Sequence, residues 1–393
     1  MKKFIIPLVT AVAVVSIILA GCVPEAAPPE APPEAPPEAP PEAPPEAPPE
    51  APAAELPGFG PMKGVAVKPD GTPYQFIYAD PWVSHPFHIP AAGICESLVR
   101  RAGGELTVYD AHGDTYRALA NLEDALVANP DGIMCETIDG YTEIPMVERI
   151  YDAGIPLVAM AVKMGTDKVL FSVYPDFVDM GAQGGIFLHN YQREHDIDLN
   201  VYVVRGYVGH WADEQRYVGL SREVVINPRI TLLNSPSTMW EDTQAAEAVS
   251  DAFLTHPELN AVWDGGAMSA GIVEGLKIAG RFYPVGNPDH VVVVAQDDIR
   301  SHWDLLQEGA VDAIMGHNSW EYVDIGIKVL LNYACLGKPP EVERVVLTSY
   351  LVELGYTPRY GASAMMGAMP LDDFDSWPVL DTSELGIPTP TLE

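Results

Sequence analysis

The chain has 393 residues, of which 48% are hydrophobic, and its 55 acidic and 22 basic residues give a formal net charge of −33. The apolar fraction excludes a wholly disordered chain, and the length allows two or three domains. A surface this acidic repels phosphate groups, so we expect no nucleic acid among the partners.

The N-terminus has the pattern of an export signal. Two lysines in Met1–Lys3 precede the stretch Phe4–Ala20, which is almost entirely apolar, and a small residue then leads to Cys22. The ending Leu-Ala-Gly-Cys resembles the bacterial lipobox, which implies cleavage before Cys22 and a diacylglyceryl group on its sulfur. We therefore predict a lipoprotein signal peptide over residues 1–21 and an extracytoplasmic protein that is lipid-anchored to the bacterial cell membrane. A plain N-terminal membrane anchor is the alternative, although 17 residues are short for a span.

Residues 22–57 are predicted to be the lipidated cysteine and a stalk. From Pro24 to Pro57 the chain repeats Ala-Pro-Pro-Glu, with 15 prolines, eight acidic residues and no apolar residues able to build a core. Proline restricts the backbone and removes N–H donors, which favours an extended polyproline-type spacer. At ~3.1 Å per residue the spacer would reach roughly 100 Å.

The rest of the chain alternates predicted strands and helices. The first series has strands at 75–79, 106–109, 132–135, 156–161 and 169–173 and helices at 90–102, 115–128 and 144–153. The second series has helices at 177–195, 213–227, 242–255, 268–279, 299–307 and 322–336 and strands at 200–205, 229–234, 261–264, 290–295 and 312–315. Such alternation predicts an α/β fold of two doubly wound, parallel-sheet lobes, in which ligands bind beyond the carboxyl ends of the strands.

Three cysteines, Cys95, Cys135 and Cys335, belong to this folded part. An odd number permits at most one disulfide even in an oxidising compartment, and buried free thiols are the favoured interpretation.

Five segments in this part are similar to the ribose-type branch of the sugar-binding type I periplasmic binding proteins, the receptors of ABC transporters. In chain order they are 84–88 (Ser-His-Pro-Phe-His), 129–133 (Asn-Pro-Asp-Gly-Ile), 152–158 (Asp-Ala-Gly-Ile-Pro-Leu-Val), 256–262 (His-Pro-Glu-Leu-Asn-Ala-Val) and 307–309 with 313–316. The resemblance runs from about Gln75 to Val352. It implies two lobes joined by three crossovers, near Tyr174, His317 and Thr348, with a ligand closed between them.

The resemblance also implies the division of the chain into lobes. Lobe 1 would hold residues 58–174 plus 318–347. Lobe 2 would hold residues 175–317 plus 348–393, the last part being a C-terminal extension that lacks helix–strand alternation and has no functional interpretation.

The resemblance nominates several ligand-binding residues. Phe87 and Trp240 match aromatic residues that stack on a sugar from opposite lobes, and Asp297 matches an aspartate that binds sugar hydroxyls. His317 matches a glutamine at the hinge. For Phe87 the alternative is packing in the core, and for Asp297 it is capping of the following helix.

Other candidates depart further from the family pattern. His85 and His88 flank Phe87, and their rings can donate and accept hydrogen bonds. Because no third ligand is evident beside this His-x-x-His pair, we predict no metal, and we predict no cofactor. Asp139, Trp211 and Asp264 are weaker candidates near predicted strand ends.

Some charged residues of the family are missing here. Ala161 and Val162 stand where an Asp-Arg pair is usual, and Glu214 stands where the family has a ligand-binding Arg, although Arg216 matches a neighbouring one. These changes favour a ligand poorer in hydroxyls, or one with a positive or neutral ring, over plain ribose.

The resulting hypothesis is a monomeric binding lipoprotein of an ABC importer, which captures a sugar or sugar-like molecule by hinge closure and delivers it to permease subunits. The alternatives are a sensor that presents its ligand to a membrane receptor kinase or chemoreceptor, and a receptor for a nucleoside-like or other non-sugar ligand. We expect no enzyme activity, because the sequence lacks the Gly-x-Ser-x-Gly, His-Glu-x-x-His, Walker and Rossmann motifs.

Overall fold

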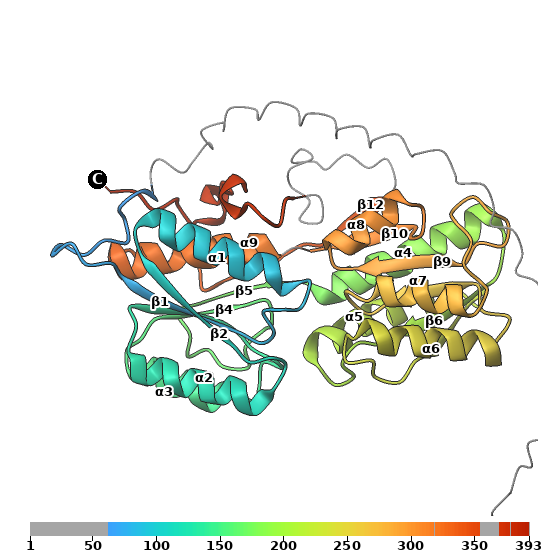
Figure 1. Cartoon of the computed structure of the whole chain (residues 1–393), viewed down its shortest axis with the longest axis horizontal. Coiled ribbons are helices and arrows are strands. Elements are labelled where there is room, and N and C mark those ends of the chain that lie inside the picture. The colour runs from blue at the N-terminus through green and yellow to red at the C-terminus, as the bar shows by residue number, and fades with distance from the viewer. Residues whose placement is uncertain (1–61, 318, 354–368, 378, 393) are drawn as a thin grey trace, which may run out of the picture. The chain divides into compact units, whose positions relative to one another are not determined.

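The computed structural model describes residues 62–317, 319–353, 369–377 and 379–392 (Figure 1). The predicted signal peptide, Cys22 and the stalk lie outside the described residues and stay predictions. Within the described segments, none of the helices combines the length and the apolar character needed to cross a bilayer.

The first lobe is built on a six-stranded, wholly parallel sheet in the order β11-β5-β4-β3-β1-β2. Its strands are β1 (Gln75–Asp80), β2 (Glu105–Asp110), β3 (Gly132–Glu136), β4 (Leu157–Met160), β5 (Phe171–Pro175) and β11 (Arg344–Leu347). Its helices are α1 (His88–Ala102), α2 (Thr115–Ala128), α3 (Ile144–Asp152) and α9 (Ser319–Leu330), the last continued by a π-helical turn, η2 (Leu331–Cys335).

The second lobe repeats this plan with the order β12-β10-β9-β8-β6-β7, in which only β12 is antiparallel to its neighbour. Its strands are β6 (Leu199–Val204), β7 (Ile230–Asn234), β8 (Ala261–Asp264), β9 (Val292–Gln296), β10 (Ala313–Gly316) and β12 (Tyr350–Glu353). Its helices are α4 (Phe177–His195), α5 (Trp211–Val224), α6 (Asp242–Thr255), α7 (Ser269–Ile278) and α8 (Arg300–Gln307). The two sheets confirm the predicted pair of doubly wound lobes.

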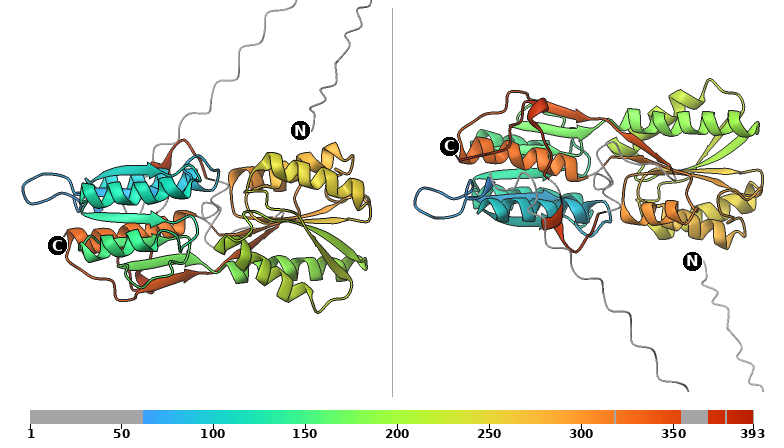
Figure 2. Two further views of the ribbon diagram at one scale, coloured as in Figure 1. Left: turned by 90° about the horizontal axis from the view of Figure 1, so that it is seen from below. Right: turned by 90° about the horizontal axis from the view of Figure 1, so that it is seen from above.

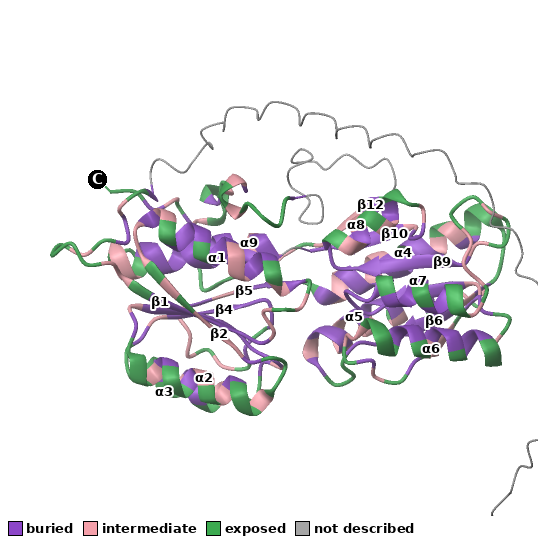
Figure 3. Ribbon diagram, viewed as in Figure 1, coloured by how far each residue is buried: buried purple, intermediate pink, exposed green. Residues whose placement is uncertain are grey.

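Apolar side chains alternate between the two faces of each strand, which explains why helices cover both faces of each sheet. On β3, Met134 faces the core beneath α1 and α9, whereas Ile133 and Cys135 face the core beneath α2 and α3. In the second lobe α6, α7 and α8 cover one face, and α4 and α5 cover the other. Figure 3 shows the consequence: the central strands of both lobes are buried, and the exposed residues lie on the outer helix surfaces. Cys95 and Cys135 are buried in these cores as free thiols, and the half-buried Cys335 is also free.

The chain passes between the two sheets three times. These passages join β5 to α4, β10 to α9, and β11 to β12. Each lobe is therefore assembled from separate stretches of the sequence, and the three connections run side by side between the lobes (Figure 2).

The C-terminal segment corrects one sequence-based prediction. β12 belongs to the second sheet, but residues 369–377 and 379–392 lie against the first lobe rather than the second (Figure 2). Trp377, buried, packs edge-to-face on Trp320 of α9 at 6.2 Å between ring centroids, and Asp375 pairs with Arg100 of α1 at 2.6 Å. The segment includes two short 3-10 turns, η5 (Phe374–Ser376) and η6 (Ser383–Leu385). Its irregular apolar spacing carries no periodic pattern, so the sequence alone did not reveal which lobe it covers.

Candidate functional site

A cavity of about 120 Å³ lies at the carboxyl ends of the strands, between the two lobes. This is the edge at which doubly wound sheets bind ligands. From the first lobe it is lined by Pro81, Trp82, His85, Phe87, His88, Gly113, Glu136, Thr137, Ile138, Ala161 and Val162. From the second lobe and the β10–α9 connection it is lined by Phe177, Tyr207, His210, Ala212, Arg216, Met239, Trp240, Ala267, Asp297 and His317.

Aromatic side chains from both lobes line this cavity. The ring centroid of Phe87, which precedes α1, lies 4.9 Å from that of His317, and the centroid of Phe177, at the start of α4, lies 5.1 Å from the same imidazole. Trp240 lies in the second lobe, perpendicular to His210 at 4.7 Å. The structure thus brings the predicted Phe87 and Trp240 to one cavity, where flat apolar surfaces can contact a ring.

The backbone around Trp240 is shaped to present the indole. Met239 and Trp240 have φ values of 54° and 57°, in the left-handed region that non-glycine residues seldom adopt. A Cβ at Gly206 would lie 2.0 Å from the indole nitrogen, so only glycine permits this approach. Such strain is maintained only where the surrounding structure demands it, which is common at binding sites.

Asp297 forms a buried polar network with Arg216 and His317. Arg216 donates to Asp297 Oδ1 at 2.5 Å and to the Gly265 carbonyl at 2.8 Å, and His317 Nε2 lies 2.9 Å from the same carboxylate oxygen. Burial opposes ionisation of Asp297, but the charge of Arg216 and the contact with His317 outweigh it and hold the pKa of the carboxyl well below its usual range. The predicted Asp297 and His317 are therefore fixed together in the cavity wall, by an arginine whose role the sequence did not establish.

Three sequence-predicted residues do not line the cavity. Asp264 is fully buried and accepts hydrogen bonds from Gly266, Met268 and Ser269, so it anchors the start of α7. Asp139 accepts bonds from Tyr141 and Thr142 within its own turn.

Trp211 lies one layer behind the cavity. Its ring packs edge-to-face against Phe177 at 5.4 Å and against Tyr174 at 5.9 Å. It supports a wall residue and does not reach the cavity itself.

The two predicted histidines of the first lobe have different surroundings. His85 lies beside Trp82, at 5.2 Å between ring centroids, and its Nδ1 accepts a hydrogen bond from the Phe87 amide. Burial and the neighbouring His88 lower the pKa of His85 to about 3.

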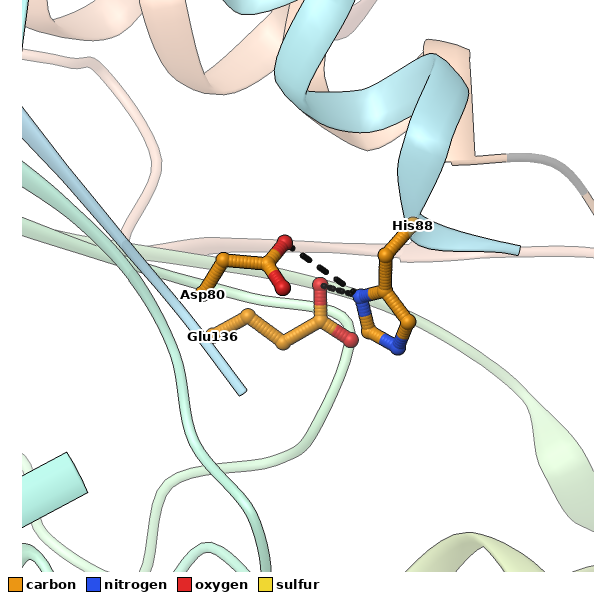
Figure 4. A group of neighbouring side chains, drawn as sticks. All are labelled: Asp80, His88 and Glu136. Atoms are coloured by element: carbon orange, nitrogen blue, oxygen red, sulfur yellow. Dashed lines mark ion pairs between the residues drawn. The ribbon is translucent and has the colours of Figure 1, made fainter. Parts of the chain in front are cut away.

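His88 instead faces two carboxylates that sequence reasoning missed. Its Nδ1 lies 3.3 Å from Asp80 Oδ2 and 3.6 Å from Glu136 Oε2 (Figure 4). Burial opposes the charge on His88, but Asp80 and Glu136 raise its pKa to about 9, and burial raises the pKa of Glu136 to about 7. No third metal ligand is evident in the sequence beside His85 and His88, whereas the fold places Asp80 and Glu136 next to His88.

Strand register explains this convergence. β1 and β3 are parallel neighbours with Ala79 opposite Cys135, so the next residue on each strand, Asp80 and Glu136, emerges at the same edge and on the same face. Both are the last residues of their strands, and α1 begins at His88 beside them. Their positions at predicted strand ends were the signal that could have identified them.

The comparisons with known proteins agree with this architecture. Residues 78–339 match the family described as periplasmic binding protein domain. The chain is 26% identical over 257 residues to the D-ribose/D-allose-binding protein of Pseudomonas aeruginosa, covering 62% of this chain and 76% of that protein.

Solved structures share the fold. A galactofuranose binding protein superposes with a TM-score of 0.65 at 16% identity, covering 72% of this chain and 95% of that one. An ABC transporter solute binding protein from Bacillus halodurans C-125 with bound myo-inositol has a TM-score of 0.64 at 18% identity, covering 71% and 94% of the two chains.

The family match, which covers more than half of the chain, the two-lobed fold and the cavity between the lobes lead to the same conclusion. These proteins bind solutes for ABC transporters and are not enzymes. The chain belongs to the type I periplasmic binding proteins.

Proposed function

We propose that the protein captures one sugar or sugar-like molecule between its lobes and delivers it to the permease of an ABC importer. The observation that carries this proposal is that one cavity is lined by Phe87 from one lobe, by Trp240 from the other and by the Asp297–Arg216 pair. Aromatic faces suit the apolar faces of a ring, and a fixed carboxylate accepts hydrogen bonds from hydroxyls. Closure of the lobes on the ligand is a hinge motion.

The relatives support a polyhydroxylated ring as the ligand class, since their names refer to ribose, allose, galactofuranose and myo-inositol. The residues of the cavity wall narrow the ligand class further. Ala161 and Val162, where related receptors have a charged pair, line the cavity with apolar atoms. Glu214, at the position of another ligand-binding arginine, is engaged with Arg205 at 2.8 Å. We therefore expect a ligand that presents fewer hydroxyls than ribose on at least one edge.

A thermal-shift screen of sugars, deoxysugars, polyols and nucleosides tests the ligand class. A ligand present at 100 times its Kd stabilises the folded protein by ~2.7 kcal/mol. Calorimetry on the hit should then show that Trp240→Ala weakens binding by about 1–3 kcal/mol, the usual cost of losing a buried aromatic anchor.

Trp303→Ala is the matched control, because Trp303 lies on α8 outside the cavity. It should leave the affinity unchanged. No stabilisation by any member of the panel would contradict the sugar-like ligand, and equal effects of the two substitutions would remove Trp240 from the site.

We further propose attachment to the membrane through a lipid on Cys22, on the evidence of the N-terminal sequence pattern. Cys22→Ser should move the protein from the membrane fraction to the soluble fraction and abolish metabolic labelling with a fatty acid. Cys335→Ser, which leaves the N-terminus intact, should stay membrane-bound and labelled. Membrane attachment and labelling that persist in Cys22→Ser would contradict lipidation at this residue.

A further inference from the structure

We propose that Asp80, His88 and Glu136 bind a divalent transition-metal ion of the Zn²⁺ type in the first-lobe wall of the cavity. These three residues, here called the Asp–His–Glu cluster, each place one potential ligand atom within 4.8 Å of the others. Figure 4 shows the two carboxylates and the imidazole directed toward one point, from the ends of β1 and β3 and the start of α1.

The spacing of the ligand atoms fits a tetrahedral ion. Zn²⁺ binds imidazole nitrogen and carboxylate oxygen at about 2.0–2.2 Å, so the edge of its coordination tetrahedron is about 3.3–3.6 Å. The two separations from His88 Nδ1, 3.3 Å to Asp80 Oδ2 and 3.6 Å to Glu136 Oε2, have these lengths. An ion can therefore bind in the cluster while these two interatomic distances stay unchanged.

Two buried ligand atoms of the cluster make only ion pairs within the cluster itself. Asp80 is only 2% exposed, and its Oδ2 and His88 Nδ1 make no hydrogen bond within the described residues, although they lie 3.3 Å apart as an ion pair. Meanwhile the other Asp80 oxygen accepts from the Trp82 amide at 2.7 Å, and Tyr322 donates to Glu136 at 3.3 Å. Supporting hydrogen bonds of this kind orient ligands in known metal sites.

The space next to the cluster also contains buried polar atoms without hydrogen-bond partners among the described residues. A small cavity of about 10 Å³ borders Asp80 and Glu136, and its lining includes Asn121, Thr137 and Glu143. Each of these three side chains has a buried polar atom without a hydrogen-bond partner among the described residues. The cavity is close to the size that one water molecule needs, so it can supply a hydrated support for the ion.

Charge and ligand type select the class of ion. The cluster buries two carboxylates beside one histidine, and the nearby Arg216 is engaged with Asp297 instead. A divalent cation that displaces the proton of His88 balances both carboxylates. One imidazole and two carboxylates suit Zn²⁺ or a similar transition metal better than Mg²⁺ or Ca²⁺, which prefer oxygen ligands alone.

The ion would keep an open coordination position. His88 and Glu136 line the ligand cavity, and only three protein ligands are present, as in metal sites that bind a further molecule. A hydroxyl pair or a carboxylate on the captured molecule could occupy the remaining position. Metal binding itself does not depend on the sugar proposal.

The experiment uses the full chain purified in detergent, stripped with a chelator and incubated with Zn²⁺ or with Co²⁺ as a spectroscopic probe. Equilibrium dialysis with elemental analysis should give one ion per chain, and bound Co²⁺ should give the intense visible absorption of a low-coordinate site. His88→Ala, Asp80→Asn and Glu136→Gln should each raise the metal Kd at least about 100-fold and remove the absorption. Circular dichroism checks that each variant is folded.

Two controls separate the cluster from other histidines. His112→Ala removes a surface histidine that pairs with Asp110 at 2.8 Å, and it should leave the stoichiometry and Kd unchanged. His85→Ala removes the other histidine of the His-x-x-His pair and should also retain the ion. Loss of the ion in either control overturns the assigned ligand set.

The proposal is also overturned if the wild-type chain binds no Zn²⁺ or Co²⁺, or if binding survives unchanged in all three cluster variants. No organic ligand is present in this experiment. Repeating the sugar screen in excess chelator therefore distinguishes a failure of the metal site from a failure of sugar capture.

Discussion

At the scale of single residues, charge neutralisation within the cavity wall bears on the stability of the fold. The guanidinium of Arg216 is buried and meets its only carboxylate among the described residues at Asp297. Asp297→Asn removes that charge while keeping the side-chain shape, so we expect the free energy of unfolding to fall by about 3 kcal/mol, as for other broken buried pairs. Asp304→Asn breaks the exposed pair with Arg300 and should change the free energy of unfolding by less than about 1 kcal/mol. Urea titration of both variants measures these changes. Similar losses in both variants would contradict this assignment.

The buried His210 is expected to make the free energy of unfolding depend on pH. Burial and then the charge of Arg216 lower the pKa of His210 to about 4, and the neutral ring's Nδ1 accepts the Ala212 amide at the start of α5. In the unfolded chain a histidine has a pKa near 6.5, so below about pH 6.5 the unfolded chain takes up the proton first. The resulting loss of stability grows as pH falls and reaches about 3 kcal/mol near pH 4.

The measurement compares urea unfolding at several pH values between 7 and 4. His210→Asn keeps a helix-capping side chain without this titration, so its stability should fall less steeply with acid than that of the wild type. His195→Asn, at an exposed position, should follow the wild-type slope. A His210→Asn slope equal to the wild-type slope would show that this histidine does not titrate differently on folding.

At the scale of elements, the C-terminal segment completes the core of the first lobe. Trp377 is buried against α9, and Lys328 of that helix donates to the Leu380 carbonyl while it pairs with Asp324. Trp377→Ala should lower the free energy of unfolding by about 3–5 kcal/mol, the range for a buried aromatic truncated to alanine. Leu371→Ala, in the same segment but exposed, should cost less than about 1 kcal/mol. Denaturant titration of the two variants tests this, and equal midpoints would show that the segment does not contribute to the core.

The sequence pattern predicted the strands and helices, but not the direction of the side chains at the strand ends. Strand–helix alternation predicted both sheets, because periodic burial leaves a periodic pattern in the sequence. It did not predict which way a strand-end side chain turns. Asp264 ends β8 and Asp297 follows β9, but Asp297 has a φ of 78° and lines the cavity, whereas the Asp264 side chain bonds to the start of α7.

Residues that converge from separate strands were the hardest to predict. Asp80 and Glu136 are 56 positions apart in the chain, and only the register between β1 and β3 makes them neighbours. Its place after the third predicted strand directed attention to Asp139 instead, which the structure uses in a local turn. The alignment of adjacent strands is set by tertiary packing, and a single sequence does not record it.

At the scale of the whole molecule, the proposed ligand capture requires the two lobes to move relative to each other while the chain stays continuous. The three passages between the sheets are the covalent links that must bend.

The burial of Met62 has a mechanical consequence. Met62, the first described residue, and Trp377 both belong to the core of the first lobe. With the proposed lipid anchor on Cys22, the chain upstream of Met62 would therefore connect the membrane to the first lobe. The second lobe, which carries Trp240 and Asp297, would then move relative to that anchored lobe when the proposed closure occurs.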